Sequence, residues 1–520
     1  MAAFLATLLC LQTLSGCASL PPPPSLRPSH AIAEVAQSPL AQLAARSLPA
    51  DGSVSGFRLM PEAATALNAR LKLAAEAKHS IDAQYYILED DPVGLLFLAS
   101  LRAAAQRGVR VRLLVDDLYA GSKYPLYAAL AAEPKLEIRL FNPLPAQGES
   151  LVSRLLLSLW ELRRINHRMH NKLFVVDNSW AVLGGRNIAA EYFMQNAMAN
   201  FIDIDLLACG QVVGELSSSF DRYWNSPDAR PIASLTGTEP AGRMATNTGW
   251  LDQSLAAALP APEAERAVDL LGESPVATQM ETGRAALIGG TARVLVDPPE
   301  KIRQADPDAR FASSVTQQTL QALGMAQQQV ILISPYFVPG ERGLQLIRDN
   351  AARGVKTIVF TNSLEATDET LVYAGYARYR WRLLRAGVRL YELGARLSGR
   401  NHELGDFKQS LGRLHAKVAI IDDRQLFLGS MNLDSRSARL NTEVGLIIES
   451  QALARTIARL SSVRLAGAYE VRVAAGDNGL EWVSRAADQS EAVRLDEPGA
   501  DWLLSLKNWF LSQLISEEQL

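Results

Sequence analysis

The chain has little of three things: long apolar runs, excess charge and cysteine. After residue 17 no apolar run is long enough to cross a bilayer, which argues against a polytopic membrane protein. The net charge of −3 argues against non-specific nucleic-acid binding, which depends on neutralising phosphates, although a local basic patch would suffice. With 520 residues, 48% hydrophobic and 21% charged, the composition indicates a globular protein long enough for two domains.

The N-terminus, "MAAFLATLLCLQTLSGCASL", carries a short apolar run of the kind found in signal peptides. It ends in Leu14-Ser15-Gly16-Cys17, which resembles a bacterial lipobox, so we expect cleavage before Cys17 and acylation of its sulfur. No lysine or arginine precedes the run, which departs from that pattern. An ordinary secretory signal or a membrane anchor with an incidental cysteine is the alternative. After cleavage Cys209 would be the one remaining free cysteine, which excludes an internal disulfide.

Two stretches repeat the same residue types at the same spacing. They are "RMHNKLFVVDNSWAVLGGRN" at 168–187 and "RLHAKVAIIDDRQLFLGSMN" at 413–432. The first contains His170, Lys172, Asp177 and Asn187, and the second contains His415, Lys417, Asp422, Ser430 and Asn432.

The flanking pattern is repeated as well. A helix, a strand, a second helix ending at Gly108 and a second strand precede the first motif, and the same order precedes the second, with Gly354 ending the helix. The two histidines lie 245 residues apart and the two glycines 246. A near-constant offset indicates an internal duplication. Strand–helix–strand order predicts parallel strands with helices on the sheet faces, and therefore two α/β layered halves.

Side chains alternate along a strand, so His170 and Lys172 should project from one face, as should His415 and Lys417. Asp177 has the opposite parity and should point away, which favours a supporting role for it and for Asp422. A histidine near a lysine is usually incidental. Two copies of the motif, at equivalent positions of a duplicated framework, are much harder to explain by a purely structural role.

The turns after each motif are built from small residues and carry Ser430, Asn187 and Asn432, whose donors suit a phosphoryl oxygen. Two histidines, two lysines and two asparagines at one point would make a phosphodiester site. One histidine would attack phosphorus and the other would protonate the leaving oxygen, while the lysines stabilise the transition state. Such a site must form where the two halves meet about a pseudo-twofold axis.

At these residues the chain resembles the phospholipase D superfamily, whose signature is the doubled H-x-K-x4-D-x6-G-G/S-x-N motif, from about Phe57 to Leu495. Within that superfamily it is most similar to bacterial cardiolipin synthases, especially the C-type branch. The stretches that carry this closer resemblance are 139–147, 163–178, 184–193, 333–343 and 440–448.

The resemblance implies duplicated phospholipase D-like α/β/α halves, one shared active site, and a phosphohistidine mechanism that needs neither metal nor cofactor. It implies that His170 is the nucleophile and His415 the acid. In the family an acidic residue follows each motif and orients the histidine of that motif. Glu443 fills this place in the second half. Asp203 is the best match in the first, with Asp205 close by.

The resemblance also implies phospholipid substrates, with phosphatidylglycerol expected and the second phospholipid left open, and no nucleic-acid partner. We expect transfer of a phosphatidyl group from one phospholipid to another, giving cardiolipin, at a membrane surface. The expected location is the bacterial cell envelope, with a lipid anchor facing the periplasm. Ala18 after Cys17 favours the outer membrane over the inner.

Two other readings remain. A phospholipase D-type hydrolase, or a nuclease, would use the same chemistry, because transfer and hydrolysis differ only in the hydroxyl that enters. A non-enzymatic envelope lipoprotein on the same fold is disfavoured because every motif position is filled.

The segment 150–168 is predicted to be an apolar helix in which Leu151, Leu155, Leu159 and Leu162 share a face, followed by Arg163, Arg164 and Arg168. Such a helix suits acyl chains and anionic headgroups, and equally suits a core helix with a solvated basic end. The expected organisation is a signal peptide (1–16), a proline-rich tether (17–56), a first half (57–240, motif 164–191), an ambiguous linker (241–284), a second half (285–495, motif 409–436) and an amphipathic tail (496–520).

Overall fold

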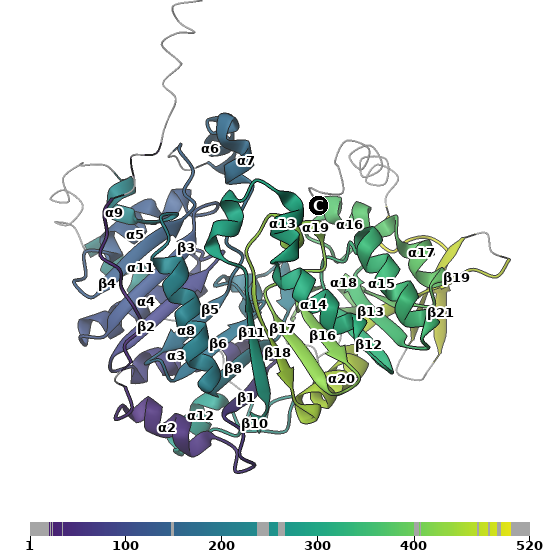
Figure 1. Ribbon diagram of the computed structural model, residues 1–520, viewed down its shortest axis with the longest axis horizontal. Coiled ribbons are helices and arrows are strands. Elements are labelled where there is room, and N and C mark those ends of the chain that lie inside the picture. The colour runs from purple at the N-terminus through teal and green to yellow at the C-terminus, as the bar shows by residue number, and fades with distance from the viewer. Residues whose placement is uncertain are drawn as a thin grey trace, which may run out of the picture.

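The structure, a computed structural model, describes residues 20, 22, 24–33, 35–146, 150–236, 249–257, 266–399, 405, 407–464, 467–476, 479–485 and 490–500. The expected signal peptide, Cys17 and the tail beyond residue 500 lie outside these residues. Figure 1 shows two mixed sheets beside each other, the first in purple and blue and the second in green and yellow, with helices packed on them.

In the described part of the chain the first sheet has nine strands and the second has ten. The order in the first is β10 (Ile288–Gly289), β1 (Ser55–Met60), β8 (Asp205–Gly210), β6 (Trp180–Gly184), β5 (Leu173–Val176), β2 (Ser80–Tyr85), β3 (Arg110–Asp116), β4 (Leu136–Phe141) and β9 (Ala229–Pro231). The order in the second is β11 (Thr291–Val296), β18 (Val444–Glu449), β17 (Gln425–Gly429), β16 (Val418–Ile421), β12 (Gln329–Ile333), β13 (Lys356–Asn362), β14 (Arg389–Leu393), β19 (Ala468–Val473), β20 (Leu480–Arg485) and β21 (Glu491–Arg494).

Seven successive strands of one sheet correspond to seven of the other, from β1 to β4 and from β11 to β14. In each sheet the strands joined through helices pair in parallel: β2 with β3 and β3 with β4 in the first, β12 with β13 and β13 with β14 in the second. The motif strands form antiparallel hairpins, β5 with β6 and β16 with β17. The two motifs therefore occupy equivalent places in two similarly ordered mixed sheets.

The helices of the first half begin and end at the residues that the sequence signals. Asp91 caps α4 (Pro92–Gln106) by accepting a hydrogen bond from the Gly94 amide, and Gly108 follows it at φ 94°. Among the described residues of 39–281 the other helical elements are α2 (Pro39–Ser47), α3 (Ala63–Glu76), η1 (Gly121–Lys123), α5 (Tyr124–Leu130), α6 (Leu151–Leu156), η2 (Leu159–Glu161), α7 (Leu162–Ile165), η3 (Ala190–Phe193), α8 (Gln211–Trp224), α9 (Ile232–Leu235), α11 (Gly249–Ala257) and α12 (Val276–Glu281).

The second half repeats this logic. Ser314 caps α14 (Val315–Gly324), and Gly354, at φ 81°, follows α15 (Gly340–Ala352). The remaining helical elements are η4 (Pro299–Arg303), α13 (Pro307–Ala312), α16 (Thr370–Ala377), α17 (Arg380–Arg385), α18 (Ala395–Gly399), α19 (Ser435–Arg439) and α20 (Gln451–Arg464). No helix in the described ranges combines the length and the apolar character that a bilayer crossing would need.

One hydrophobic core runs across both sheets. It joins Phe174 and Val182 of the first motif hairpin to Ile420 and Leu428 of the second. Helix α8 packs on β5 and β8 of its own half and also on β11 of the other half. A core shared in this way holds the two halves in a fixed relation, which a site built from both of them requires.

The expectation that residues 17–56 form a tether is wrong for its C-terminal part. Helix α2 buries Leu40 and Leu43, and the Leu40 carbonyl accepts a hydrogen bond from the Trp180 indole. Upstream, the Ser29 carbonyl accepts a hydrogen bond from Arg112. This segment therefore belongs to the folded body, because its apolar side chains complete the first-half core. The expected linker likewise contains α11 and α12, which pack on α4 and α3.

Candidate active site

The two motif histidines lie just before strands β5 and β16, where the halves meet. The His170 amide donates to the Thr442 carbonyl at 2.9 Å, and the His415 amide donates to the Ile202 carbonyl at 2.8 Å. In the second case the contact extends β15 (Leu411–Leu414), which pairs with β7 (Ala199–Ile202) of the other half. Backbone pairing between the halves therefore positions both histidines.

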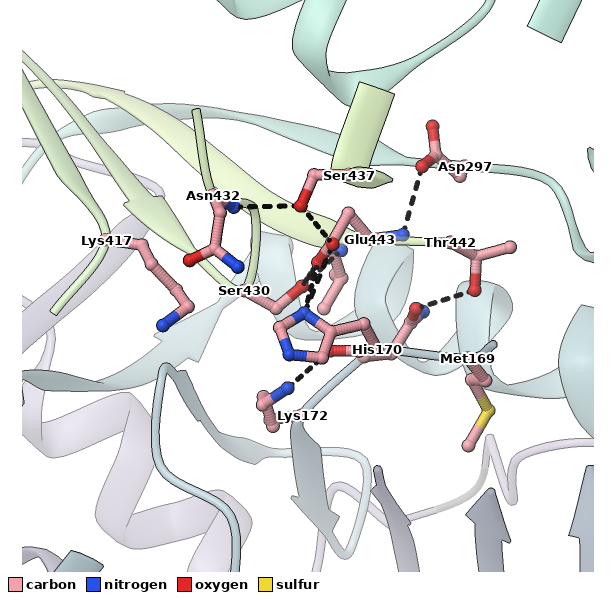
Figure 2. A network of polar contacts seen from close by, with 12 residues as sticks. Met169, His170, Lys172, Asp297, Lys417, Ser430, Asn432, Ser437, Thr442 and Glu443 are labelled. Atoms are coloured by element: carbon pink, nitrogen blue, oxygen red, sulfur yellow. Dashed lines mark hydrogen bonds and ion pairs between the residues drawn. The ribbon is translucent and has the colours of Figure 1, made fainter. Parts of the chain in front are cut away.

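These two backbone contacts also bring an acidic residue to each histidine, but from the opposite half. His170 Nδ1 lies 3.0 Å from Glu443 Oε2, and His415 Nδ1 lies 2.7 Å from Asp203 Oδ2 (Figure 2 shows the first pair). The expectation that each acid orients the histidine of its own motif is therefore wrong. Glu443 follows Thr442 and Asp203 follows Ile202, so the inter-half pairing carries each acid across the interface. Asp205, the alternative first-half acid, instead forms an ion pair with Arg70.

Glu443 is held by two further donors, the hydroxyl groups of Ser430 and Ser437. The first half has Gly185 in place of Ser430. A methyl group on Gly185 would collide with the Asp203 carboxylate, so the glycine leaves room for that side chain. Ser430 therefore acts through Glu443 in this structure, rather than standing free to bind phosphate as its motif position suggested.

Each motif lysine lies against the backbone of the histidine of its own motif. Lys172 Nζ donates to the His170 carbonyl at 2.8 Å and Lys417 Nζ to the His415 carbonyl at 2.6 Å. Both lysines are buried. Burial lowers the pKa of Lys417 to about 8 and the pKa of Lys172 well below its ordinary value, each partly offset by the nearby carboxylates. The charge of Lys417 also lowers the pKa of Lys172, as expected for cations that face one centre.

Both histidines are held in the neutral state at neutral pH. Burial and then the charge of Lys417 lower the pKa of His415 to about 4, although Asp203 opposes this. Burial, Lys172, Lys417 and Arg436 lower the pKa of His170 well below its ordinary value. In each neutral ring Nδ1 carries the proton donated to a carboxylate, which leaves the Nε2 lone pair for chemistry.

The two acids differ in charge. Burial tends to raise the pKa of Asp203, but its contacts with His415 and the charge of Lys417 lower it to about 2. Burial raises the pKa of Glu443 to about 7, against the lowering effects of Lys172 and the two serines. Asp203 is therefore a full negative charge at neutral pH, while Glu443 is only partly ionised.

Asp177 and Asp422 lie away from the histidines, as their parity predicts. Asp177 accepts hydrogen bonds from the amides of residues 78–80, and Asp422 from those of residues 327–329. Both occupy hairpin turns at positive φ, 46° and 53°. Their side chains fix the start of the neighbouring strand, so the structure gives them no contact with the reacting groups.

The two asparagines differ in their contacts. Both ends of the Asn187 amide are used within the protein, since Oδ1 accepts from the Ile87 amide and Nδ2 donates to Tyr192 Oη. This contradicts the expectation that Asn187 is free to bind phosphate. The Asn432 side chain lies beside Lys417 in Figure 2, and its Oδ1 has no hydrogen-bond partner among the described residues.

Three aromatic rings and one arginine surround the histidines and were missed from the sequence. Tyr86 lies edge-on to His170, with ring centres 5.1 Å apart. Tyr192 and Phe201 contact the ring of His415 at 5.0 and 4.8 Å. Tyr86 directly follows β2 in "QYYIL", a strand that the sequence predicts, but the other two rings come from other elements. Arg436 binds Asn166 through both nitrogens and lowers the proton affinity of His170.

Among the residues that the structure describes, no group of three or more histidine, cysteine or carboxylate side chains is placed to hold a metal ion. The arrangement instead presents two neutral imidazoles, two cations and two carboxylates. A phosphodiester anion fits such a centre, because the lysines balance its charge and either Nε2 can act as a nucleophile or a base.

Residues 71–224 and 319–461 match the family model described as "Cardiolipin synthase, PLD-like domain". The chain is 36% identical over 443 residues to cardiolipin synthase C of Escherichia coli (strain K12), covering 84% of this chain and 90% of that protein. It is 26% identical over 387 residues to cardiolipin synthase A of Pseudomonas entomophila (strain L48), covering 74% of this chain and 63% of that protein.

Among solved structures, the phosphatidylserine synthase of Haemophilus influenzae Rd KW20 superposes with a TM-score of 0.55 at 15% identity. The superposition covers 91% of this chain and 96% of that one. At this identity the likeness concerns the fold. It extends over both halves, consistent with the matching strand orders of the two sheets.

Proposed function

Because the chain belongs to the cardiolipin synthase family of phospholipase D-like proteins, we propose that it transfers a phosphatidyl group from one phospholipid to a hydroxyl of another, giving cardiolipin. The observation that carries this proposal is the crossed pairing of Glu443 with His170 and Asp203 with His415. It leaves two Nε2 atoms and two lysines at a single centre made by both halves. We propose that most of 57–240 and of 285–495 forms these halves, with α2 added to the first half and β10 joining the first sheet.

In the first step His170 Nε2 attacks the donor phosphorus. The bond from phosphorus to the headgroup oxygen breaks, and His415 gives its proton to that oxygen. The product is a phosphatidyl group bonded to His170, whose Nδ1–H still donates to Glu443. Lys172 and Lys417 balance the negative charge of the phosphoryl oxygens, and Asn432 is the remaining polar side chain of the motif turns that is free to join them.

In the second step the hydroxyl of the acceptor lipid loses its proton to His415 Nε2 and attacks phosphorus. The bond between phosphorus and His170 breaks, which restores both side chains. If water enters in place of the lipid hydroxyl, the same centre hydrolyses its substrate. A phospholipase D-type phosphodiesterase is therefore the second candidate.

The assignment of roles has an electrostatic basis. The acid must hold a proton and the nucleophile must not. The fully ionised Asp203 stabilises an imidazolium at His415. Glu443 is only partly ionised, and three cations lie near His170. A bound phosphate anion would raise the proton affinity of both histidines, and His415 would take up the proton first.

The apolar segment after residue 150 supports a lipid substrate. It is broken into α6, η2 and α7 rather than forming one helix, and it stands out from the body at the top of Figure 1. Six of its side chains are at least half exposed, which argues against a core helix. This apolar patch comprises Val152, Leu156, Leu157, Leu159, Trp160 and Leu162. A contiguous apolar surface of this kind suits a membrane interface.

We propose a membrane-associated bacterial protein that is anchored by a lipid on Cys17 and faces the periplasm, with the outer membrane favoured. The apolar patch would then contact the same bilayer that supplies the substrates. Phosphatidylglycerol is the expected substrate lipid.

The test is product analysis. Purified protein is mixed with vesicles that contain phosphatidylglycerol and phosphatidylethanolamine, and the lipids are analysed by mass spectrometry. We expect cardiolipin. His170→Ala and His415→Ala should each lower turnover by orders of magnitude, and the double variant should be little worse than either, because the two residues act as one unit. Phosphatidic acid as the sole product would favour the hydrolase, and independent half-sized losses would contradict a shared site.

A further inference from the structure

A cleft lies between the first half and the second, lined in part by residues that precede His170 in the chain. Its volume is about 730 Å³, and it lies between α7 on one side and η4, α13 and the end of α19 on the other. The cleft is rich in arginine, with Arg163, Arg164, Arg303, Arg310 and Arg439 among its lining residues. Of the lining residues, which all belong to the described chain, none is a carboxylate.

The charge of this arginine cleft is only partly balanced from outside. Arg164 pairs with Glu161, Arg303 with Asp228 at 3.2 Å, and Arg439 with Asp308 at 3.9 Å. These three acids face three of the five arginines. The charge of Asp306 acts on a fourth, Arg310, whose Nη1 donates to the Gln304 carbonyl. Arg310 is about nine-tenths buried, and its Nε has no hydrogen-bond partner among the described residues. The cleft therefore retains positive charge and a buried donor, as a site for an anion would.

His167 gives the cleft a feature that a simple phosphate site does not need. Its ring is 8% exposed, and Nδ1 contacts the Arg163 carbonyl, which can only accept a hydrogen bond. Nδ1 therefore carries the proton. Burial, with a contribution from Arg310, lowers the pKa of His167 to about 4, so Nε2 is an acceptor at neutral pH. Nε2 has no partner in the described chain, and a buried acceptor of this kind calls for a donor.

The cleft is connected to the catalytic centre. Asn166, which lines the cleft, accepts hydrogen bonds from two guanidinium nitrogens of Arg436 at 2.9 and 3.0 Å. The charge of Arg436 acts on His170, three residues beyond His167 in the chain. On the other side, the apolar patch ends at Leu162, next to Arg163 and Arg164. A lipid whose acyl chains lie at the patch could therefore place its headgroup in the cleft.

We infer that the arginine cleft holds the headgroup of the acceptor lipid, an anionic phospholipid whose headgroup carries hydroxyl groups. The arginines bind its phosphodiester oxygens, and one headgroup hydroxyl donates to His167 Nε2. A glycerol headgroup has two hydroxyls, so one can donate to His167 while the other attacks the phosphatidyl group on His170. This inference rests on the proposed function, and it adds the feature that favours a lipid hydroxyl over water.

The donor lipid does not need this cleft, because the lysines of the catalytic centre hold its phosphate. An amine headgroup is a poor fit, since its positive charge would meet the arginines. Free phosphate shares the anionic chemistry but has no acyl chains for the patch. These differences define the arms of the experiment.

The experiment measures the ratio of cardiolipin to phosphatidic acid formed by the full chain on phosphatidylglycerol vesicles. His167→Phe keeps a ring but removes the acceptor, and Arg163→Gln changes an exposed cation whose loss should not affect folding. Each should lower the ratio about tenfold, since a lost hydrogen bond to the headgroup weakens acceptor binding by about that factor and water then competes. Arg424→Gln, an exposed arginine on the turn between β16 and β17, is the matched control and should leave the ratio unchanged.

An unchanged ratio in both cleft variants, with products still formed, would overturn the inference and leave the proposed function intact. If the unaltered protein forms neither product, the proposed function fails, and binding decides the inference. Short-chain phosphatidylglycerol should then bind about tenfold more weakly to Arg163→Gln than to the unaltered chain. The inference would be overturned if Arg163→Gln and the unaltered chain bound phosphatidylglycerol equally, or if the unaltered chain bound phosphatidylcholine as tightly. It would also be overturned if inorganic phosphate or a single-stranded oligonucleotide displaced the lipid at a concentration lower than that of the lipid.

Discussion

His170 and His415 occupy equivalent positions in the sequence, but their surroundings differ in charge. Asp203 is fully ionised next to His415, whereas Glu443 next to His170 shares its charge with two serine hydroxyls and Lys172. Burial causes this difference, because it raises the pKa of Glu443 against the lowering effects of Lys172 and the two serines. The two acids also differ in one neighbouring position of the repeats, Gly185 against Ser430. The glycine makes room for an aspartate carboxylate, and the serine donates a hydrogen bond to the glutamate.

The first prediction concerns the pH dependence of turnover on a soluble phosphodiester with a poor leaving group. Removing a carboxylate lowers the pKa of the histidine it contacts, because the imidazolium loses its counter-charge. Asp203→Asn should therefore move the basic limb, where the protonated acid is lost, to lower pH. Glu443→Gln should move the acidic limb, where the nucleophile becomes protonated, to lower pH.

The two variants serve as controls for each other, since each removes one negative charge from the same centre. If Asp203→Asn moves the acidic limb and Glu443→Gln moves the basic one, the roles of the histidines are reversed. If neither limb moves, the carboxylates do not act through the histidines.

Gly185 provides a second prediction at this scale. In Gly185→Ala the new methyl group would displace the Asp203 carboxylate. Because that carboxylate is buried and would lose its contact with His415, the midpoint of denaturant unfolding should fall, and the pH profile should approach that of Asp203→Asn. Gly214→Ala, whose methyl would meet no atom within 4 Å, is the control. A normal pH profile in Gly185→Ala would show that Asp203 does not need this space.

At the scale of elements, each motif aspartate connects the turn of its hairpin to the start of the neighbouring strand by hydrogen bonds. Asp422 accepts three backbone hydrogen bonds at the start of β12, and Asp177 does the same at the start of β2. The neighbouring Asp423 has almost the same φ, 51° against 53°, but makes one side-chain contact with Gln329. Because the two residues share the same backbone conformation, the difference between their alanine variants measures the hydrogen bonds and not backbone strain.

Asp422→Ala should lower the free energy of unfolding by about 1–3 kcal/mol at neutral pH, and Asp423→Ala by less. Burial tends to raise the pKa of Asp422, but the three amides lower it overall. A depressed folded-state pKa means that the contribution is present above the unfolded-state pKa and is lost as pH falls through the folded-state value. Denaturant unfolding at several pH values measures this, and a loss that does not shrink in acid would contradict the account.

The elements show where sequence patterns suffice. The helix and strand order, the two glycine-terminated helices and the fold class follow from periodicity and duplication, and the structure confirms them. The single helix expected over 150–168 was wrong, because it breaks near Ser158, which carries no helix-breaking signal. The tether was wrong at α2, because proline-rich composition says nothing about Leu40 and Leu43, which find partners in the core.

At the scale of the whole molecule, the active site is a product of the interface between the halves. The motif residues could be found from spacing, because each sits on a local pattern. The crossing of Glu443 and Asp203 could not, since it depends on β7 pairing with β15 and on Met169 pairing with Thr442, residues more than 200 apart in the chain. Arg436 and the arginine cleft escaped prediction for the same reason.

Attachment to the membrane is tested in the cell. If Cys17 is acylated, Cys17→Ser should leave the protein uncleaved or released, with the membrane-bound fraction reduced. Fractionation followed by immunoblotting measures both. Cys209→Ser is the matched control, since Cys209 is buried and should not affect processing. A Cys17→Ser protein that remains processed and membrane-bound as before would contradict the lipid anchor.

The covalent intermediate is the central claim, and it can be observed directly. His415→Ala is mixed with a phosphatidyl ester whose leaving group needs no proton, denatured at alkaline pH to preserve the phosphorus–nitrogen bond, digested and analysed by mass spectrometry. A phosphatidyl adduct should accumulate on the peptide that contains His170, because no base remains to activate the acceptor. His170→Ala treated in the same way should carry none. An adduct on the His415 peptide of His170→Ala, or none on His170 in His415→Ala, would contradict the mechanism.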